Sequence, residues 1–174
     1  MDPPPRPLLL VVEVVALSFW LGAAVLLAAV VAPALFAALP SRTSAGEVVG
    51  RVLPVLLWLG ILVALIVGLI EVVARSGLLT KSAGFFIALA CGYGLVLGQR
   101  IDRLRTSVGQ PIETLSASDP RRVDFGRMHG LSVAALGVGM LAAAGLTVSA
   151  VRRLLGQRTT RRTFQQNFEP SHHA

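Results

Sequence analysis

The chain has 174 residues, of which 54% are hydrophobic and only 14% are charged, and its mean hydropathy is +0.72. A soluble domain has a smaller share of apolar residues and a larger share of charged residues. This composition therefore excludes a soluble globular domain and requires lipid as the solvent. The formal charge of +7 lies at segment ends and in loops, where a basic excess favours anionic lipid headgroups over nucleic acid. We therefore expect the lipid bilayer as a partner, and no nucleic acid.

Long uncharged runs predict four membrane-spanning helices. These runs extend from Val14 to Leu39, Val52 to Ile70, Ser82 to Gln99 and Met128 to Val151. Each has the length of a spanning helix, and the polar alternation of β-barrel strands is absent. The sequence therefore predicts an all-α integral membrane four-helix bundle over residues 1–153, with spans at about 8–38, 50–74, 80–100 and 123–151.

Prolines and a change in composition mark the ends of these spans. Pro33 lacks a backbone donor and predicts a kink near the end of the first span. Pro54 falls in the first turn of the second span, where the missing donor costs least. Asp119 followed by Pro120 is typical of a helix start. Residues 154–174 are polar and basic, and we predict that they form a disordered tail.

The segment after the third span is amphipathic. Ile101, Leu104 and Val108 share one helical face, while charged residues lie between them. This pattern predicts a short amphipathic extension of the third helix, lying at the headgroups.

The sequence contains no motif typical of catalysis or of cofactor binding. Cys91 is the only cysteine, so an intramolecular disulfide is impossible and a thiolate metal cage is not expected. A nucleophile elbow, a phosphate-binding loop and a cluster of cysteine and histidine with metal-ligand spacing are also absent from the sequence. We expect no enzymatic activity and no cofactor.

Ionisable residues near the ends of the spans are the first candidates for function, because charge is costly in lipid. Glu13 lies inside the first span. After two crossings, Glu71 and Arg75 return to the same side of the bilayer, one helical turn apart. We favour a structural clamp in which Glu13 faces the bundle interior and is neutral or paired with Arg75. The alternatives are a proton or cation site and simple snorkelling to the interface.

His129 is the candidate on the opposite side of the bilayer. It lies near the start of the fourth span, within predicted reach of Arg51 and of the turn from Pro33 to Phe36. A histidine there could bind copper or haem iron, or act as a proton switch. Because His172 and His173 lie in the tail on the other side, no second histidine faces it within one chain. We favour an inward-facing, hydrogen-bonded structural histidine and expect no metal site.

Short motifs follow one another in a recognisable order. They read Phe19-Trp20-Leu21-Gly22, then Val31-Ala32-Pro33-Ala34-Leu35-Phe36, then Ala45-Gly46-Glu47-Val48-Val49-Gly50-Arg51-Val52-Leu53-Pro54, and finally Phe125-Gly126-Arg127-Met128-His129-Gly130-Leu131-Ser132. Together, from about Leu17 to Val151, the chain resembles the transmembrane-protein-205-like family, also catalogued as domain of unknown function 4149. The resemblance implies a small four-helix membrane protein and supplies no reaction or ligand. Its motif residues here are Trp20, Gly22, Pro33, Phe36, Gly46, Pro54 and Gly130.

One position departs from that family pattern. A polar residue, often asparagine, is expected about two turns after the His-Gly pair, and Leu136 stands there. The polar network around His129 is therefore expected to be thinner than the resemblance implies.

These features favour a non-enzymatic accessory or scaffold protein that packs against other membrane helices or against a second copy. The alternative is a small ion, proton or metal carrier or sensor that uses Glu13 or His129. Four helices can hardly enclose a pathway, so transport would require an oligomer. The sequence does not identify a substrate or a partner protein.

The distribution of basic residues bears on the topology. Basic residues divide evenly between the two sides of the bilayer, so the positive-inside rule is nearly silent. The C-terminal cluster Arg152, Arg153, Arg158, Arg161 and Arg162 leads us to place both termini in the cytoplasm. Lys81 is the only lysine beside many arginines, alanines and glycines, which favours a bacterial cell membrane.

Overall fold

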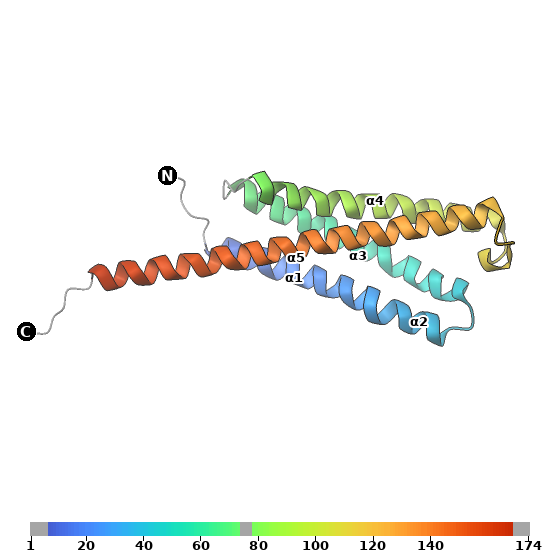
Figure 1. Cartoon of the computed structure of the whole chain (residues 1–174), viewed down its shortest axis with the longest axis horizontal. Helices are drawn as coiled ribbons and strands as arrows, with labels where there is room; N and C mark the ends of the chain where they lie inside the picture. Colours follow the sequence, from blue (N-terminus) through green and yellow to red (C-terminus); the bar gives the residue numbers. More distant parts are fainter. Residues whose placement is uncertain (1–6, 74–77, 169–174) are drawn as a thin grey trace, which may run out of the picture.

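The computed structural model describes residues 7–73 and 78–168, with side chains for residues 7–73 and 82–157. Its elements are α1 (Pro7–Leu26), a π-helical turn η1 (Leu27–Val31), α2 (Ala32–Ala38), α3 (Arg42–Val73), α4 (Leu78–Val108), a short 3₁₀ turn η2 (Ile112–Thr114) and α5 (Pro120–Phe168) (Figure 1). The described residues form no strand. Four of these stretches are long and apolar enough to cross a membrane: Pro7–Ala38, Arg42–Val73, Ser82–Val108 and Pro120–Gln157. The predicted all-α four-helix membrane fold is therefore confirmed.

The helices form a closed ring in which each one packs on its neighbours. Helix α1 packs on α3 and α5, and α4 packs on the same two helices. Short connections make successive helices antiparallel, as in other up-and-down bundles. Figure 1 shows that α1 begins at the end of the bundle toward which α5 runs, whereas η2 and the turn between α2 and α3 lie at the opposite end.

The buried face of α1 follows from the spacing of its residues. Leu10, Glu13, Leu17, Trp20, Ala24 and Leu27 are buried and are separated by three or four positions. This spacing keeps them on one side of the helix. The Trp20 indole nitrogen donates a hydrogen bond of 2.9 Å to the Leu56 carbonyl of α3, so the largest core side chain also has its polar atom satisfied.

The predicted irregularity at Pro33 takes the form of a π-helical turn. Residues Leu27–Val31 are π-helical immediately before the proline, and α2 resumes the α-helix at Ala32. Proline has no N–H to donate and its ring crowds the preceding turn, so a wider turn accommodates it within a continuous span.

The amphipathic extension of the third helix is part of α4 itself. Ile101, Leu104 and Val108 are half-buried, while Asp102 and Arg103 are exposed. The helix ends at Gly109, whose φ of 67° is the left-handed conformation common after a helix C-terminus.

Helix α5 continues past its predicted end near residue 151. It is helical to Phe168, so residues 154–168 are not the disordered tail that their polar composition predicts. Between Pro120 and Pro170 the chain has no proline, and leucine, arginine and glutamine favour the helix. Residues 169–174 of that predicted tail lie outside the described residues.

The closest approach between helices predicts a sensitive position at Gly60. A Cβ atom at Gly60 would lie 2.5 Å from the Cys91 sulfur and 2.7 Å from the Trp20 indole nitrogen. We expect Gly60→Ala to lower the free energy of unfolding by about 1–3 kcal/mol, because the core has no room for a methyl group. Thermal melting of the purified protein in mild detergent measures this loss.

Gly68→Ala in the same helix is the matched control. A Cβ at Gly68 has nothing within 4 Å. Alanine there should leave the melting temperature unchanged or raise it, since glycine costs a helix roughly 0.5–1 kcal/mol relative to alanine. Equal melting temperatures for the two variants would contradict the tight packing at Gly60.

Candidate functional site

Three charged side chains meet at the end of the bundle where α1 begins. The Arg153 Nη2 atom donates to Glu13 Oε1 at 2.9 Å and to Glu71 Oε1 at 2.8 Å. The side chains of both glutamates are 0% exposed, whereas that of Arg153 is 25% exposed. One guanidinium nitrogen therefore ties α1, α3 and α5 together through two fully buried carboxylates.

The helical repeat of each element brings these residues to the same place. Glu13 belongs to the buried stripe of α1, and Glu71 follows the buried Ile70 in the last turn of α3. In α5 the buried Ala143, Leu146 and Ala150 lead, at spacings of three and four, directly to Arg153. The arginine thus continues the core face of α5 toward its exposed end.

The cluster has one more negative charge than positive charge if all three groups are ionised. The second carboxylate oxygen of Glu13 and that of Glu71 are buried and have no hydrogen-bond partner. When one of the two carboxyl groups carries a proton, the cluster is neutral and gains a donor for one of these oxygens. Chemically, the arrangement can clamp three helices and can also hold a single proton.

The structure assembles this site partly as the sequence predicts. Glu13 does face the bundle interior, and Glu71 is within one side-chain reach of it through Arg153. Arg75, the predicted partner, lies outside the described residues. The sequence analysis places Arg153 in the C-terminal basic cluster and does not identify it as a site residue. Its spacing from Ala143, Leu146 and Ala150 is the signal that puts it on the core face of α5.

His129 lies at the opposite end of the bundle and is exposed. Its ring stacks on Phe125 with an interplanar angle of 4° and a centroid distance of 6.1 Å. The predicted inward hydrogen bond is not made to any described residue, and Arg51 is exposed on α3 and does not join it. The expectation that His129 ties the helix ends together is therefore wrong. A cavity separates it from α2 and from the start of α3.

This cavity has a volume of about 970 Å³ and lies among α2, α3, α4, η2 and α5. Part of its lining is apolar and includes Leu27, Leu53, Leu57, Leu95 and Leu136. Polar side chains from the helix ends also line it, among them Arg42, Thr43, Gln99, Asp102, Arg105, Glu113, Arg122 and His129. The cavity is thus amphipathic, with apolar walls from the spans and polar groups from their ends.

The motif residues divide between the core and this cavity. Trp20 is in the core, whereas Phe36, Gly46 and Pro54 line the cavity. Gly22 and Gly130 have open space where a Cβ would stand. Pro33 is exposed beside the π-helical turn.

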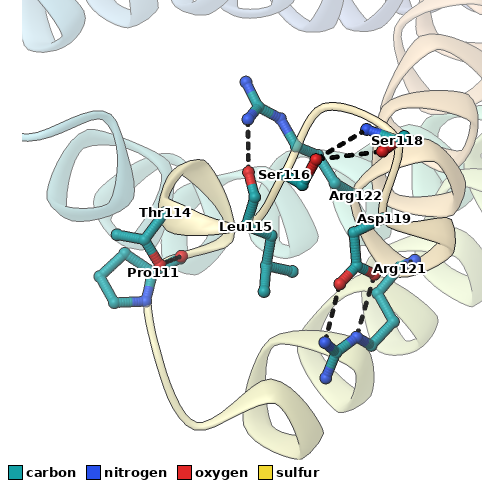
Figure 2. Close-up of polar contacts among 8 residues, drawn as sticks. All are labelled: Pro111, Thr114, Leu115, Ser116, Ser118, Asp119, Arg121 and Arg122. Carbon is teal, nitrogen blue, oxygen red and sulfur yellow. Dashed lines mark hydrogen bonds and ion pairs between the residues drawn. The ribbon is translucent and has the colours of Figure 1, made fainter.

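The segment before α5 borders the cavity and is held by its own polar contacts (Figure 2). Arg122 donates from Nη1 to the Leu115 carbonyl at 2.6 Å, and Asp119 accepts from the Arg121 backbone N–H at 2.9 Å as the predicted helix cap. The side chain of Arg121 also donates to Asp119, which lowers the pKa of that carboxyl. The cap is therefore fully formed above the ordinary titration range of aspartate and is lost only as the pH falls through the lowered pKa.

In the described part of the chain, no three His, Cys, Asp or Glu side chains gather closely enough to hold a metal ion.

Comparisons with known proteins give a family match without an activity. Residues 15–99 match the family described as Domain of unknown function (DUF4149). The matched segment covers most of α1, all of α2 and α3, and α4 as far as Gln99, and stops before α5. Comparison with curated proteins and with solved structures finds no match.

The charge cluster predicts that Arg153 contributes far more to the stability of the fold than the adjacent Arg152 does. We expect Arg153→Met to lower the free energy of unfolding by about 3–5 kcal/mol, because two buried carboxylates lose their cation. Arg152→Met, which changes an exposed arginine beside it, should have little effect. Thermal melting in detergent compares the two.

A triple variant tests whether the loss comes from uncompensated charge. Adding Glu13→Gln and Glu71→Gln to Arg153→Met should recover most of the lost stability, since no buried charge then remains. If Arg153→Met and Arg152→Met melt alike, the cluster is not a clamp.

Proposed function

We propose that this multi-pass membrane protein is a non-enzymatic accessory protein that binds a transmembrane helix of another protein along the outer face of α5. The observation that carries the proposal is a stripe of small residues on that face, which we call the α5 stripe. It consists of Gly126, Gly130, Ala134, Gly137 and Gly145, with Leu141 between the last two.

The α5 stripe lies opposite the face that α5 uses for the bundle core. At 100° per residue, its members point away from Gly139, Ala143 and Leu146, which pack inward. A Cβ at Gly139 would meet Trp20 at 3.4 Å and Ala90 at 3.5 Å. By contrast, nothing lies within 4 Å of a Cβ built at any of the four glycines of the α5 stripe.

Glycines on an outer helix face have a cost that calls for an explanation. Each one destabilises a helix by roughly 1 kcal/mol relative to alanine and offers lipid little apolar surface. In a membrane, small residues let a second helix approach closely, and the van der Waals contact then stabilises the pair. The charge cluster and the Trp20 hydrogen bond hold the core side of the bundle, so α5 presents its outer face on a fixed scaffold.

Leucine substitution in the α5 stripe tests this proposal. We expect the wild-type protein, extracted from its native membrane in mild detergent, to carry one other membrane protein in fixed ratio, measured by native mass spectrometry. Gly137→Leu should lose that partner, because its side chain would hold the partner helix away. Folding should persist, because the leucine enters open space.

Gly68→Leu in α3 is the matched control, since it also adds a leucine at an open glycine outside the α5 stripe. It should keep the partner. A protein that is found alone, that associates only with itself, or that keeps the same partner in Gly137→Leu would contradict the accessory role.

A second candidate function is a proton carrier or sensor centred on Glu13. It is favoured by the two buried carboxylates on one guanidinium nitrogen, each with an oxygen that lacks a hydrogen-bond partner. In this case Glu13→Gln should abolish proton flux into vesicles that hold a pH-sensitive dye, while melting stays near that of the wild type. The accessory role instead predicts no flux for either protein.

We also propose that both ends of the chain lie in the cytoplasm of a bacterial cell. Four spans place the start of α1 and the end of α5 on one side, and Arg152, Arg158, Arg161 and Arg162 add positive charge there. We further propose that the chain is a member of the transmembrane-protein-205-like family. The motif around His129, which lies beyond the matched residues 15–99, supports this membership.

Reporter fusions after Ala174 test the orientation. A green fluorescent protein fused there should be fluorescent, and an alkaline phosphatase at the same position should be inactive, because it folds only outside the cytoplasm. The opposite pair of results would place the termini outside.

A further inference from the structure

The cavity near His129 contains a cation that forms no ion pair with any side chain that the structure describes. Arg105 of α4 is half-buried and lines the cavity. Its guanidinium carbon lies 5.2 Å from the centre of the Phe125 ring, and its Nη2 occupies the space where a Cβ at Gly46 would stand. No carboxylate of the described residues forms an ion pair with it, and a guanidinium cannot lose its charge in a protein.

A second arginine lines the same cavity from α5. Arg122 is half-buried, and its Nη1 donates to the Leu115 carbonyl, as Figure 2 shows. This bond fixes the direction of the side chain and leaves other N–H groups free to donate. Two half-buried guanidinium groups, on two different helices, thus line one cavity.

The acidic residues of the cavity do not cancel these charges. Glu47, Asp102 and Glu113 are exposed, and the Glu113 carboxylate already accepts a hydrogen bond from Thr43 at 3.0 Å. Exposed charges are screened by solvent, whereas half-buried ones are screened much less. The cavity therefore favours an anion near Arg105 and Arg122.

The remainder of the cavity favours a hydrocarbon chain. Leu53, Leu57, Leu95 and Leu136 form part of its apolar lining, within helices that could span the bilayer. Its volume of about 970 Å³ is at the upper end of the range typical of ligand sites. An occupant must therefore combine a negatively charged head with an apolar tail.

We propose that this cavity binds one anionic phospholipid from the surrounding bilayer. The phosphate accepts hydrogen bonds from Arg105 and Arg122, and an acyl chain lies along the leucine wall. The acyl chain fills apolar space that would otherwise be empty or filled with water. The phosphate supplies a negative charge that balances the positive charge of the two arginines. The site shares only Gly126 with the α5 stripe, and it lies at the opposite end of the bundle from the charge cluster.

Native mass spectrometry of the delipidated protein, after titration with dioleoyl phosphatidylglycerol or dioleoyl phosphatidylcholine, tests the proposal. We expect one phosphatidylglycerol to bind in preference to phosphatidylcholine, whose choline would place a positive charge near the arginines. Arg105→Gln should weaken phosphatidylglycerol binding roughly tenfold, the value of one hydrogen bond between charged groups.

Arg103→Gln is the matched control for charge. Arg103 lies two residues away in α4 and lines a separate, shallow hollow with Arg100 and Arg127. Its loss should leave phosphatidylglycerol binding unchanged. Gly98→Leu tests the apolar part of the cavity, because it puts a side chain into open space at the cavity wall. It should weaken the binding of both lipids, whereas Gly92→Leu, which lies away from the cavity, should leave the binding of both unchanged.

Melting in detergent verifies that each variant is folded before lipid is added. Equal binding of the two lipids would overturn the proposal. It would also be overturned if Arg103→Gln lost as much phosphatidylglycerol as Arg105→Gln, since the basic surface in general would then attract the headgroup. Normal binding by Gly98→Leu would show that the lipid lies elsewhere.

Discussion

Arg153 donates to two buried carboxylates from a single nitrogen, and this contact holds together three helices that meet nowhere else through charged groups among the described residues. In the interior of a membrane bundle an ionised group must find its partner within the protein, because lipid offers none. The position of α5 relative to α1 and α3 is therefore set by where Glu13 and Glu71 can both reach one guanidinium. The leucine and alanine seams that follow along the same helix faces then pack in the register that this contact allows.

The two ends of the bundle differ because, among the described residues, no ion pair joins the helices at the opposite end. There the π-helical turn and Pro33 lead into α2, which packs on α3 but lies away from the core. His129 makes a ring contact with Phe125 and does not bridge the helices. The space between the helix ends remains as a cavity, and the half-buried arginines beside it belong to α4 and α5. At one end of the bundle the buried carboxylates are paired with Arg153, which holds three helices together. At the other end no such pair joins the described parts of the helices, and a cavity remains between them.

Helix α5 combines these features on its different faces. Its core face carries Gly139, Ala143 and Arg153, and its first turns border the cavity through Arg122 and Phe125. Its outer face carries the α5 stripe. A partner helix on that outer face and a lipid in the cavity would both approach Gly126 but would otherwise contact different sides of one helix. Substitution at Gly137 therefore changes the outer face and leaves the cavity unaltered.

The sequence by itself determined the number of membrane-spanning segments, the irregularity at Pro33, the cap at Asp119 and the inward direction of Glu13. Each of these depends on local composition, on the covalent limits of proline or on the cost of charge in lipid, all of which act within one segment. The predicted start of the second span was wrong, because α3 begins at Arg42 and Pro54 lies inside it and not in its first turn. The sequence did not determine that α5 extends to Phe168, because the polar composition after residue 153 favours a disordered tail as much as a solvated helix. Only the tertiary structure decided that Arg153, 140 positions from Glu13, is its partner and that His129 borders a cavity. Those contacts depend on how far the helices are rotated and separated, which is settled by packing along whole helices and not by any one segment.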